Sequence, residues 1–168
     1  MAELAPRERL QPSLLDRLTD DAPDQAIEAR ERRVMSMRSL REGVLRDLAW
    51  LLNTTNLLSV TAHKRLPHVA NSVLNYGMPD MSGASLAGMS AADLERAIRQ
   101  AIWDFEPRLI RSSVQVRAMP TSDTITKINF EIEADMWAQP YPERLYIKSE
   151  LDLDQARISL SESTGRRP

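Results

Sequence analysis

One stretch, residues 90–119, constrains the fold more than any other part of the sequence. Ser90 followed by Asp93 resembles a capping box, an arrangement that starts a helix and places a carboxylate at its positive end. Apolar residues then recur three and four positions apart, which predicts an amphipathic helix. They are Leu94, Ala97, Ile98, Ala101, Ile102 and Phe105. This apolar stripe must cover a sheet or another helix.

A proline ends this helix. Pro107 has no backbone N–H and its ring would clash with the carbonyl of Trp103, so we expect the helix to end near Phe105 and a strand to leave directly from the stop. Side chains two apart in an extended segment point the same way, so Glu106 and Arg108 should project together. Two interpretations stay open: a local ion pair that satisfies the last helical carbonyls, or a charged fork available to a partner protein.

Alternating apolar and polar residues after this corner predict an antiparallel sheet. The apolar positions are Val114, Val116 and Ala118, then Ile128, Phe130, Ile132, Ala134 and Met136, then Leu145, Ile147, Leu151 and Leu153. A turn at 154–156 is expected to lead into a last short strand. The fold class is therefore α+β, with a small antiparallel sheet of three to four strands and helices packed on one face. Residues 123–154 hold eight acidic and three basic residues, which predicts an acidic open face.

At this point the chain resembles a known family. The segment Trp-Asp-Phe-Glu-Pro-Arg-Leu at 103–109, followed by alternating strands, is similar to the sheath-initiator proteins of contractile-tail baseplates, a family once labelled lysozyme-like. The segment Pro-Ser-Leu-Leu-Asp-Arg-Leu at 12–18 resembles its type VI secretion branch, the TssE proteins. The resemblance spans about residues 13–160. It implies a non-catalytic baseplate subunit that links the baseplate wedge to the contractile sheath and templates sheath polymerisation by strand exchange.

The resemblance also implies two binding surfaces. Glu106, Pro107 and Arg108 would face the wedge proteins, the TssF, TssG and TssK complex. The last strand would accept an extended segment of the sheath subunits TssB and TssC, because it lacks proline and carries little charge; the alternative is an edge too short to be used. The residues expected at this edge are Arg157, Ile158, Ser159 and Leu160.

Four apolar side chains stand apart from the predicted core. Leu14, Leu15 and Leu18 form a short stripe on a helical turn begun by Ser13, which could dock on this domain or on a neighbour. Trp103 lies off the stripe of its helix, so it is either a packing residue at the rim or an anchor for a partner. We treat all four as possible partner-docking residues.

The length of 168 residues suits one domain. We expect a flexible segment at 1–29 with a short helix near 13–19, one domain at 30–162 and a disordered tail at 163–168. The longest helix is predicted from Arg30 to Leu52. Within 57–88, a short helix is expected at 69–76 and a turn at 75–80.

Several functions are disfavoured. The chain has no cysteine, and His63 and His68 are five residues apart with Pro67 between them, so we expect no metal and no cofactor. No run is apolar enough to insert into a membrane and no signal peptide is evident, which predicts a cytoplasmic protein on the cytoplasmic side of a membrane-anchored secretion machine. The net charge of −2 argues against nucleic acid.

Two alternative functions remain. A regulatory adaptor of the same fold would bind a protein partner without joining a baseplate. A muramidase would need two carboxylates flanking a sugar, and Asp104 and Glu106 are near in sequence but straddle a helix end. Of the two, the enzyme is the less favoured.

Overall fold

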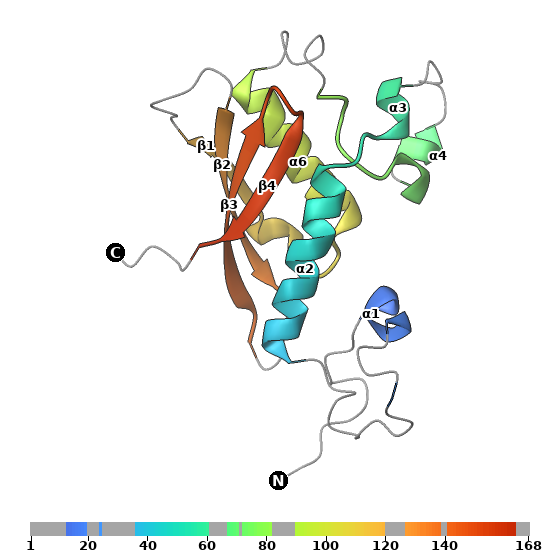
Figure 1. Ribbon diagram of the computed structural model, residues 1–168, viewed down its shortest axis with the longest axis vertical. Helices are drawn as coiled ribbons and strands as arrows, with labels where there is room; N and C mark the ends of the chain where they lie inside the picture. The colour runs from blue at the N-terminus through green and yellow to red at the C-terminus, as the bar shows by residue number, and fades with distance from the viewer. Residues whose placement is uncertain are drawn as a thin grey trace.

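The computed structural model describes residues 13–19, 24, 36–60, 67–70, 72–81, 90–119, 127–138 and 141–163. The elements are α1 (Leu14–Leu18), α2 (Met37–Leu52), α3 (Leu57–Val60), α4 (Pro67–Ala70), η3 (Val73–Asn75), α6 (Ala91–Phe105), η4 (Arg111–Ser113), β1 (Gln115–Met119), β2 (Lys127–Met136), β3 (Glu143–Asp152) and β4 (Arg157–Glu162). Their arrangement is shown in Figure 1. The α+β class predicted from the sequence is confirmed.

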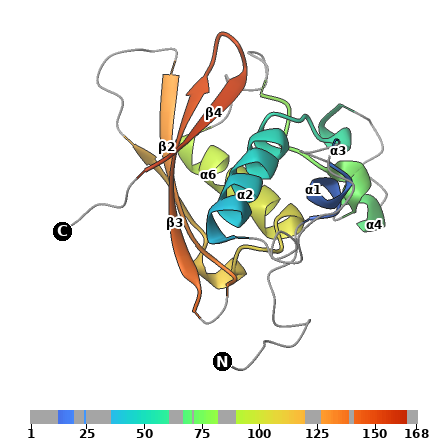
Figure 2. The ribbon, with the colours of Figure 1, turned by 60° about the horizontal axis from the view of Figure 1, so that its bottom comes forward.

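The four strands form one antiparallel sheet in the order β1-β2-β3-β4. Figure 2 shows the sheet nearly edge-on, with α2 and α6 on the same side of it. Helix α6 lies against β1 and helix α2 against β4, so each helix covers one half of the sheet. The apolar stripes of both helices and the apolar side of every strand together form a single core.

Helix α6 forms as the sequence predicts. The Ser90 hydroxyl accepts the N–H of Asp93 at 3.2 Å, and the Asp93 carboxylate accepts the N–H of Ser90 at 2.9 Å, which completes the capping box. The helix ends at Phe105, and the N–H of Glu106 makes its last bond, to the carbonyl of Ile102 at 2.9 Å. Pro107 thus stops the helix where expected.

The strand does not leave directly from this stop, and that expectation is wrong. The N–H of Leu109 bonds the carbonyl of Glu106 at 3.2 Å, so the chain turns, passes through η4 and enters β1 only at Gln115. The intervening residues run beside the end of β2, where the Ser113 hydroxyl accepts the N–H of Asp135 at 2.8 Å. These bonds to β2 satisfy the backbone that a longer strand would otherwise have paired.

Helix α2 is shorter at its start than predicted. Ser36 has an extended backbone and its hydroxyl accepts the N–H of Ser39 at 3.0 Å, so the helix begins at Met37 and not at Arg30. A serine hydroxyl in this position competes with continued helix and favours a cap. Residues 30–35, where the prediction placed the first turns, lie outside the described residues.

The segment predicted as one helix at 69–76 is divided into α4 and η3, and the chain bends at Gly77, within the predicted turn at 75–80. Gly77 has φ +123° there, and a Cβ atom would lie 2.3 Å from the carbonyl oxygen of Thr54. This close approach lets Met78 exchange backbone bonds with the chain after α2, donating to Thr54 at 2.7 Å and accepting from Asn56 at 2.8 Å.

The open face of the sheet is charge-balanced, so the prediction of an acidic face is wrong. Strand register places Arg117, Glu131 and Lys148 opposite one another in one row. The ion pairs across this face are Lys127–Glu150 at 2.6 Å, Arg144–Asp135 at 2.7 Å and Arg117–Glu133 at 3.9 Å. A count along residues 123–154 omits Arg117 and includes Glu143, which lies on the helix-covered side and pairs with Arg41.

Candidate functional site

The corner after α6 holds a closed ion pair. Arg108 donates from Nε to Oε1 of Glu106 at 2.7 Å and from Nη2 to Oε2 at 2.5 Å, and its backbone N–H bonds Oε1 at 3.1 Å. Glu106 is only 4% exposed, and the Arg108 side chain is 24% exposed. The two side chains thus lie together as predicted. The carboxylate and the guanidinium bond each other, however, so the pair is not an open fork.

Helix α2 supplies the next group. Asp47 accepts a bond from Nη2 of Arg108 at 2.6 Å, and its backbone carbonyl accepts the Tyr76 hydroxyl at 3.3 Å. Sequence reasoning did not single out Asp47. The sequence did contain a signal for it, because Asp47 is a charged residue three positions after Val44 and next to Leu48. Both Val44 and Leu48 are fully buried in α2.

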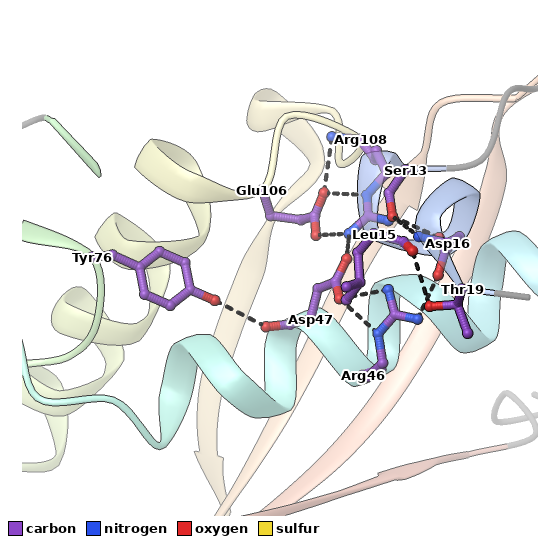
Figure 3. Close-up of polar contacts among 9 residues, drawn as sticks. All are labelled: Ser13, Leu15, Asp16, Thr19, Arg46, Asp47, Tyr76, Glu106 and Arg108. Carbon is purple, nitrogen blue, oxygen red and sulfur yellow. Dashed lines mark hydrogen bonds and ion pairs between the residues drawn. The ribbon is translucent and has the colours of Figure 1, made fainter. Parts of the chain in front are cut away.

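The chain of charges continues to α1. Arg46 bonds Asp47 from Nε at 2.9 Å and Asp16 from Nη1 at 2.5 Å, while the Ser13 hydroxyl donates to Asp16 at 2.7 Å. Glu106, Arg108, Asp47, Arg46 and Asp16 therefore alternate in sign from the corner after α6 through α2 to α1, as Figure 3 shows. We call these five residues the corner network. It ties α1, α2 and the end of α6 together.

Three members of the network, Asp16, Arg46 and Arg108, have pKa values shifted toward their charged forms. The hydrogen bond from Arg46 lowers the pKa of Asp16, and the bond to Asp16 raises the pKa of Arg46. Burial alone would lower the pKa of Arg108, but its bonds to Glu106 and Asp47 outweigh burial, so that pKa lies above its usual value.

An open hollow of about 440 Å³ lies over the network. Its lining residues are Ser13, Leu15, Asp47, Trp50, Leu51, Tyr76, Phe105, Glu106, Pro107 and Arg108. Trp50 is 51% exposed and its ring lies 5.3 Å from the Arg46 guanidinium; Leu15 is 42% exposed. Pro107 is exposed as well, whereas Glu106 is buried. A partner would therefore meet apolar side chains held in place by the charges.

Helix α1 contacts its own domain through polar groups. Asp16 bonds α2 and Ser13 bonds Asp16, whereas Leu14 and Leu18 are 70% and 76% exposed. The leucine stripe is thus left uncovered by the described residues. Trp103 lies outside the corner network: it is 36% exposed, and the guanidinium of Arg111 lies 5.2 Å from its ring.

The last strand is an edge strand, as predicted, but part of its edge is occupied. The side-chain amide of Asn53, at the end of α2, donates to the Ile158 carbonyl at 2.8 Å and accepts the Ile158 N–H at 2.8 Å. Both groups point away from β3. Sequence reasoning did not single out Asn53. The opposite edge of the sheet, β1, is partly occupied as well: the Glu95 carboxylate accepts the N–H of Ala118 at 2.6 Å.

Among the described residues, those considered for other chemistry are not assembled into a site. Asp104 accepts a bond from the Gln100 side chain at 2.8 Å and forms an ion pair with Arg111 at 3.2 Å, and Glu106 forms an ion pair with Arg108. His68 is exposed, and His63 lies outside the described residues. In the described part of the chain, no three His, Asp or Glu side chains are grouped to hold a metal ion.

Comparison with known proteins gives one clear result. The family described as baseplate wedge protein gp25 matches residues 38–141, which include α2, the corner and β2. No curated protein and no solved structure matches significantly. None of the helices in the described ranges is both long and apolar enough to cross a membrane.

Proposed function

This chain belongs to the baseplate wedge protein gp25 family, and from that premise we propose that it is the TssE-type subunit of a type VI secretion baseplate. It would link the baseplate wedge to the contractile sheath and template sheath polymerisation by accepting a strand. A structural baseplate role follows from the family, which is mainly structural. Its location would be cytoplasmic, at the cytoplasmic side of the secretion machine.

The open part of the β4 edge supports the proposal that the chain binds the sheath. The Ser163 N–H bonds the Tyr146 carbonyl at 2.8 Å, so odd-numbered residues bond β3 and even-numbered ones point outward. Leu160 and Glu162 therefore present their N–H and C=O groups on the outer side, with no bond to them from the described residues. An extended segment of TssB or TssC would pair with these groups.

The corner network supports the proposal that the chain binds the wedge proteins. Glu106 and Arg108 are engaged with each other and with Asp47, so we assign them a supporting role. The contact surface for TssF, TssG and TssK would be the exposed rim that they hold, above all Pro107, Trp50 and Leu15. Exposed apolar side chains around a rigid charged centre are typical of a binding hot spot.

The wedge surface is tested by co-purification with the wedge proteins. Leu15→Ala should reduce recovery of the complex, whereas Met119→Ala, which removes a side chain of similar exposure at the far end of β1, should not (42% against 40% exposed). Equal recovery with Leu15→Ala, Trp50→Ala and the control would overturn this surface. Capture of a protease adaptor instead of wedge proteins would favour the regulatory alternative.

The sheath edge is tested with proline. Leu160→Pro removes one outward N–H but no bond to β3, so the domain should fold while sheath assembly fails. Ser159→Pro removes a bond within the sheet and should destabilise the domain itself. Normal sheath assembly on a folded Leu160→Pro variant would contradict the strand-accepting role.

A further inference from the structure

We infer that Asn53 is a register stop: it occupies the β4 edge at Ile158, so that an added strand pairs only from Leu160 onward. This inference rests on the proposed strand-accepting function and adds to it the residue that fixes where pairing begins. It concerns the residue that caps the end of α2, outside the sheet.

The Asn53 amide imitates one residue of a neighbouring strand. A primary amide carries the same donor and acceptor as a peptide group, and here both bond the backbone of one residue, Ile158, at 2.8 Å each. The same nitrogen also donates to the Ala49 carbonyl at 2.7 Å. Two bonds therefore hold the amide against the edge, and the third fixes it to the end of helix α2.

Helix α2 also holds β4 at its other end. Arg41, near the start of α2, pairs with Glu162 at 3.2 Å and with Glu143 in β3. Of the three outward-facing residues of β4, Ile158 is thus capped, Glu162 has its side chain fixed, and Leu160 lies between them. The backbone open to a partner is the half of the strand that ends at Glu162.

A stop is needed because the pleat alone does not define the register. A slip of one residue moves every side chain to the wrong face and is penalised by burial, but a slip of two residues preserves the faces. An added strand that slips toward Arg157 would have to displace Asn53 and lose its two bonds to Ile158. A strand that ends before Ile158 breaks no bond. Asn53 therefore distinguishes registers that differ by two residues.

The occupant this edge favours is an extended segment that carries no proline where it faces Leu160. Leu160 is half-buried on the helix-covered side, so the neighbouring side chain of the added strand should be apolar. On the open side, Ser159 and Ser161 are exposed and neutral, which places no charge requirement on the partner there. The sheath subunits are the partners to examine for such a segment.

Cysteine cross-linking tests the register, and the chain has no cysteine of its own. Ser161→Cys places a thiol on the exposed side of β4, and sheath-subunit variants with single cysteines at successive positions report which residue lies opposite. With Asn53 present, one partner position should cross-link. With Asn53→Ala, the position two residues away should cross-link with comparable yield.

Two further variants separate register from folding. Asn53→Asp keeps the acceptor for the Ile158 N–H but places a carboxylate against two carbonyls, so it should release the edge as Asn53→Ala does. Glu95→Gln changes the opposite edge and should leave the register unchanged. Amide exchange at Ile158 in the free protein should accelerate in both Asn53 variants while core amides of β2 stay protected.

The outcomes are distinguishable. A single cross-linked position that is the same with and without Asn53 would refute the register stop and leave the proposed function intact. Several positions two residues apart in the presence of Asn53 would also refute it. No cross-link to any sheath position in any background would refute the strand-accepting function itself.

Discussion

Removing the Glu106 carboxylate should destabilise the whole domain. Glu106→Ala deletes a bidentate pair and one bond to the Arg108 N–H, and among the described residues leaves Asp47 as the one carboxylate bonded to a half-sheltered guanidinium. Breaking a buried pair by removing one partner costs about 3–5 kcal/mol. Because Arg108 is 24% exposed and keeps Asp47, we expect roughly 2–3 kcal/mol of lost stability.

The assay is reversible thermal and urea unfolding of the purified protein. For a chain of this length, each kcal/mol shifts the Tm by about 2–4 °C, so the expected decrease is roughly 5–10 °C. The matched control is Asp135→Ala, which removes an equally bidentate pair, 2.7 and 3.0 Å long, from the open face of the sheet. Arg144 is 53% exposed there, so the control should lose clearly less stability than Glu106→Ala.

A double-mutant cycle completes the test. Arg108→Ala in the Glu106→Ala background removes the stranded charge, so the double variant should be less destabilised than the sum of the two single variants. A Glu106→Ala variant as stable as Asp135→Ala would refute the buried pair as a structural element. Any wedge-binding loss must then be read against these stabilities, because a destabilised corner alone also weakens binding.

Three other perturbations have definite expected results. Gly77→Ala forces a Cβ to within 2.3 Å of the Thr54 carbonyl at φ +123°, so it should cost about 3 kcal/mol or more in urea unfolding; an unchanged midpoint would contradict this geometry. The lowered pKa of Asp16 means that its bond to Arg46 stabilises α1 above the ordinary carboxyl pKa of 3.8 and is lost as pH falls through the lowered value. Amide exchange in α1 should therefore accelerate in acid, and Asp16→Asn should abolish that pH dependence. Ser90→Ala should cost about 1 kcal/mol by Tm, whereas Ser112→Ala, at an exposed site, should cost little.

Periodicity and local chemistry were readable in the sequence. The capping box at Ser90, the stop at Pro107 and the alternation in the strands each depend on residues within a few positions of one another, so no knowledge of distant contacts was needed. The pairing of Glu106 with Arg108 was equally local. The charge of the open face was not, because it depends on which strand lies beside which: Arg117 and Arg157, outside the counted range, lie on this face, and Glu143, inside the range, does not.

Most of the helices and strands, and the residues at the corner, could be predicted from the sequence because they depend on neighbours along the chain. What those residues do depends on contacts between distant parts of the chain. Arg108 and Asp47 are 61 positions apart, and Asn53 and Ile158 are 105 apart. Bonds over such separations form only when the core brings α2 against β4 and the corner, and no local pattern encodes that approach. The charged groups at the corner are therefore bonded to one another, and the edge of β4 is partly capped by Asn53.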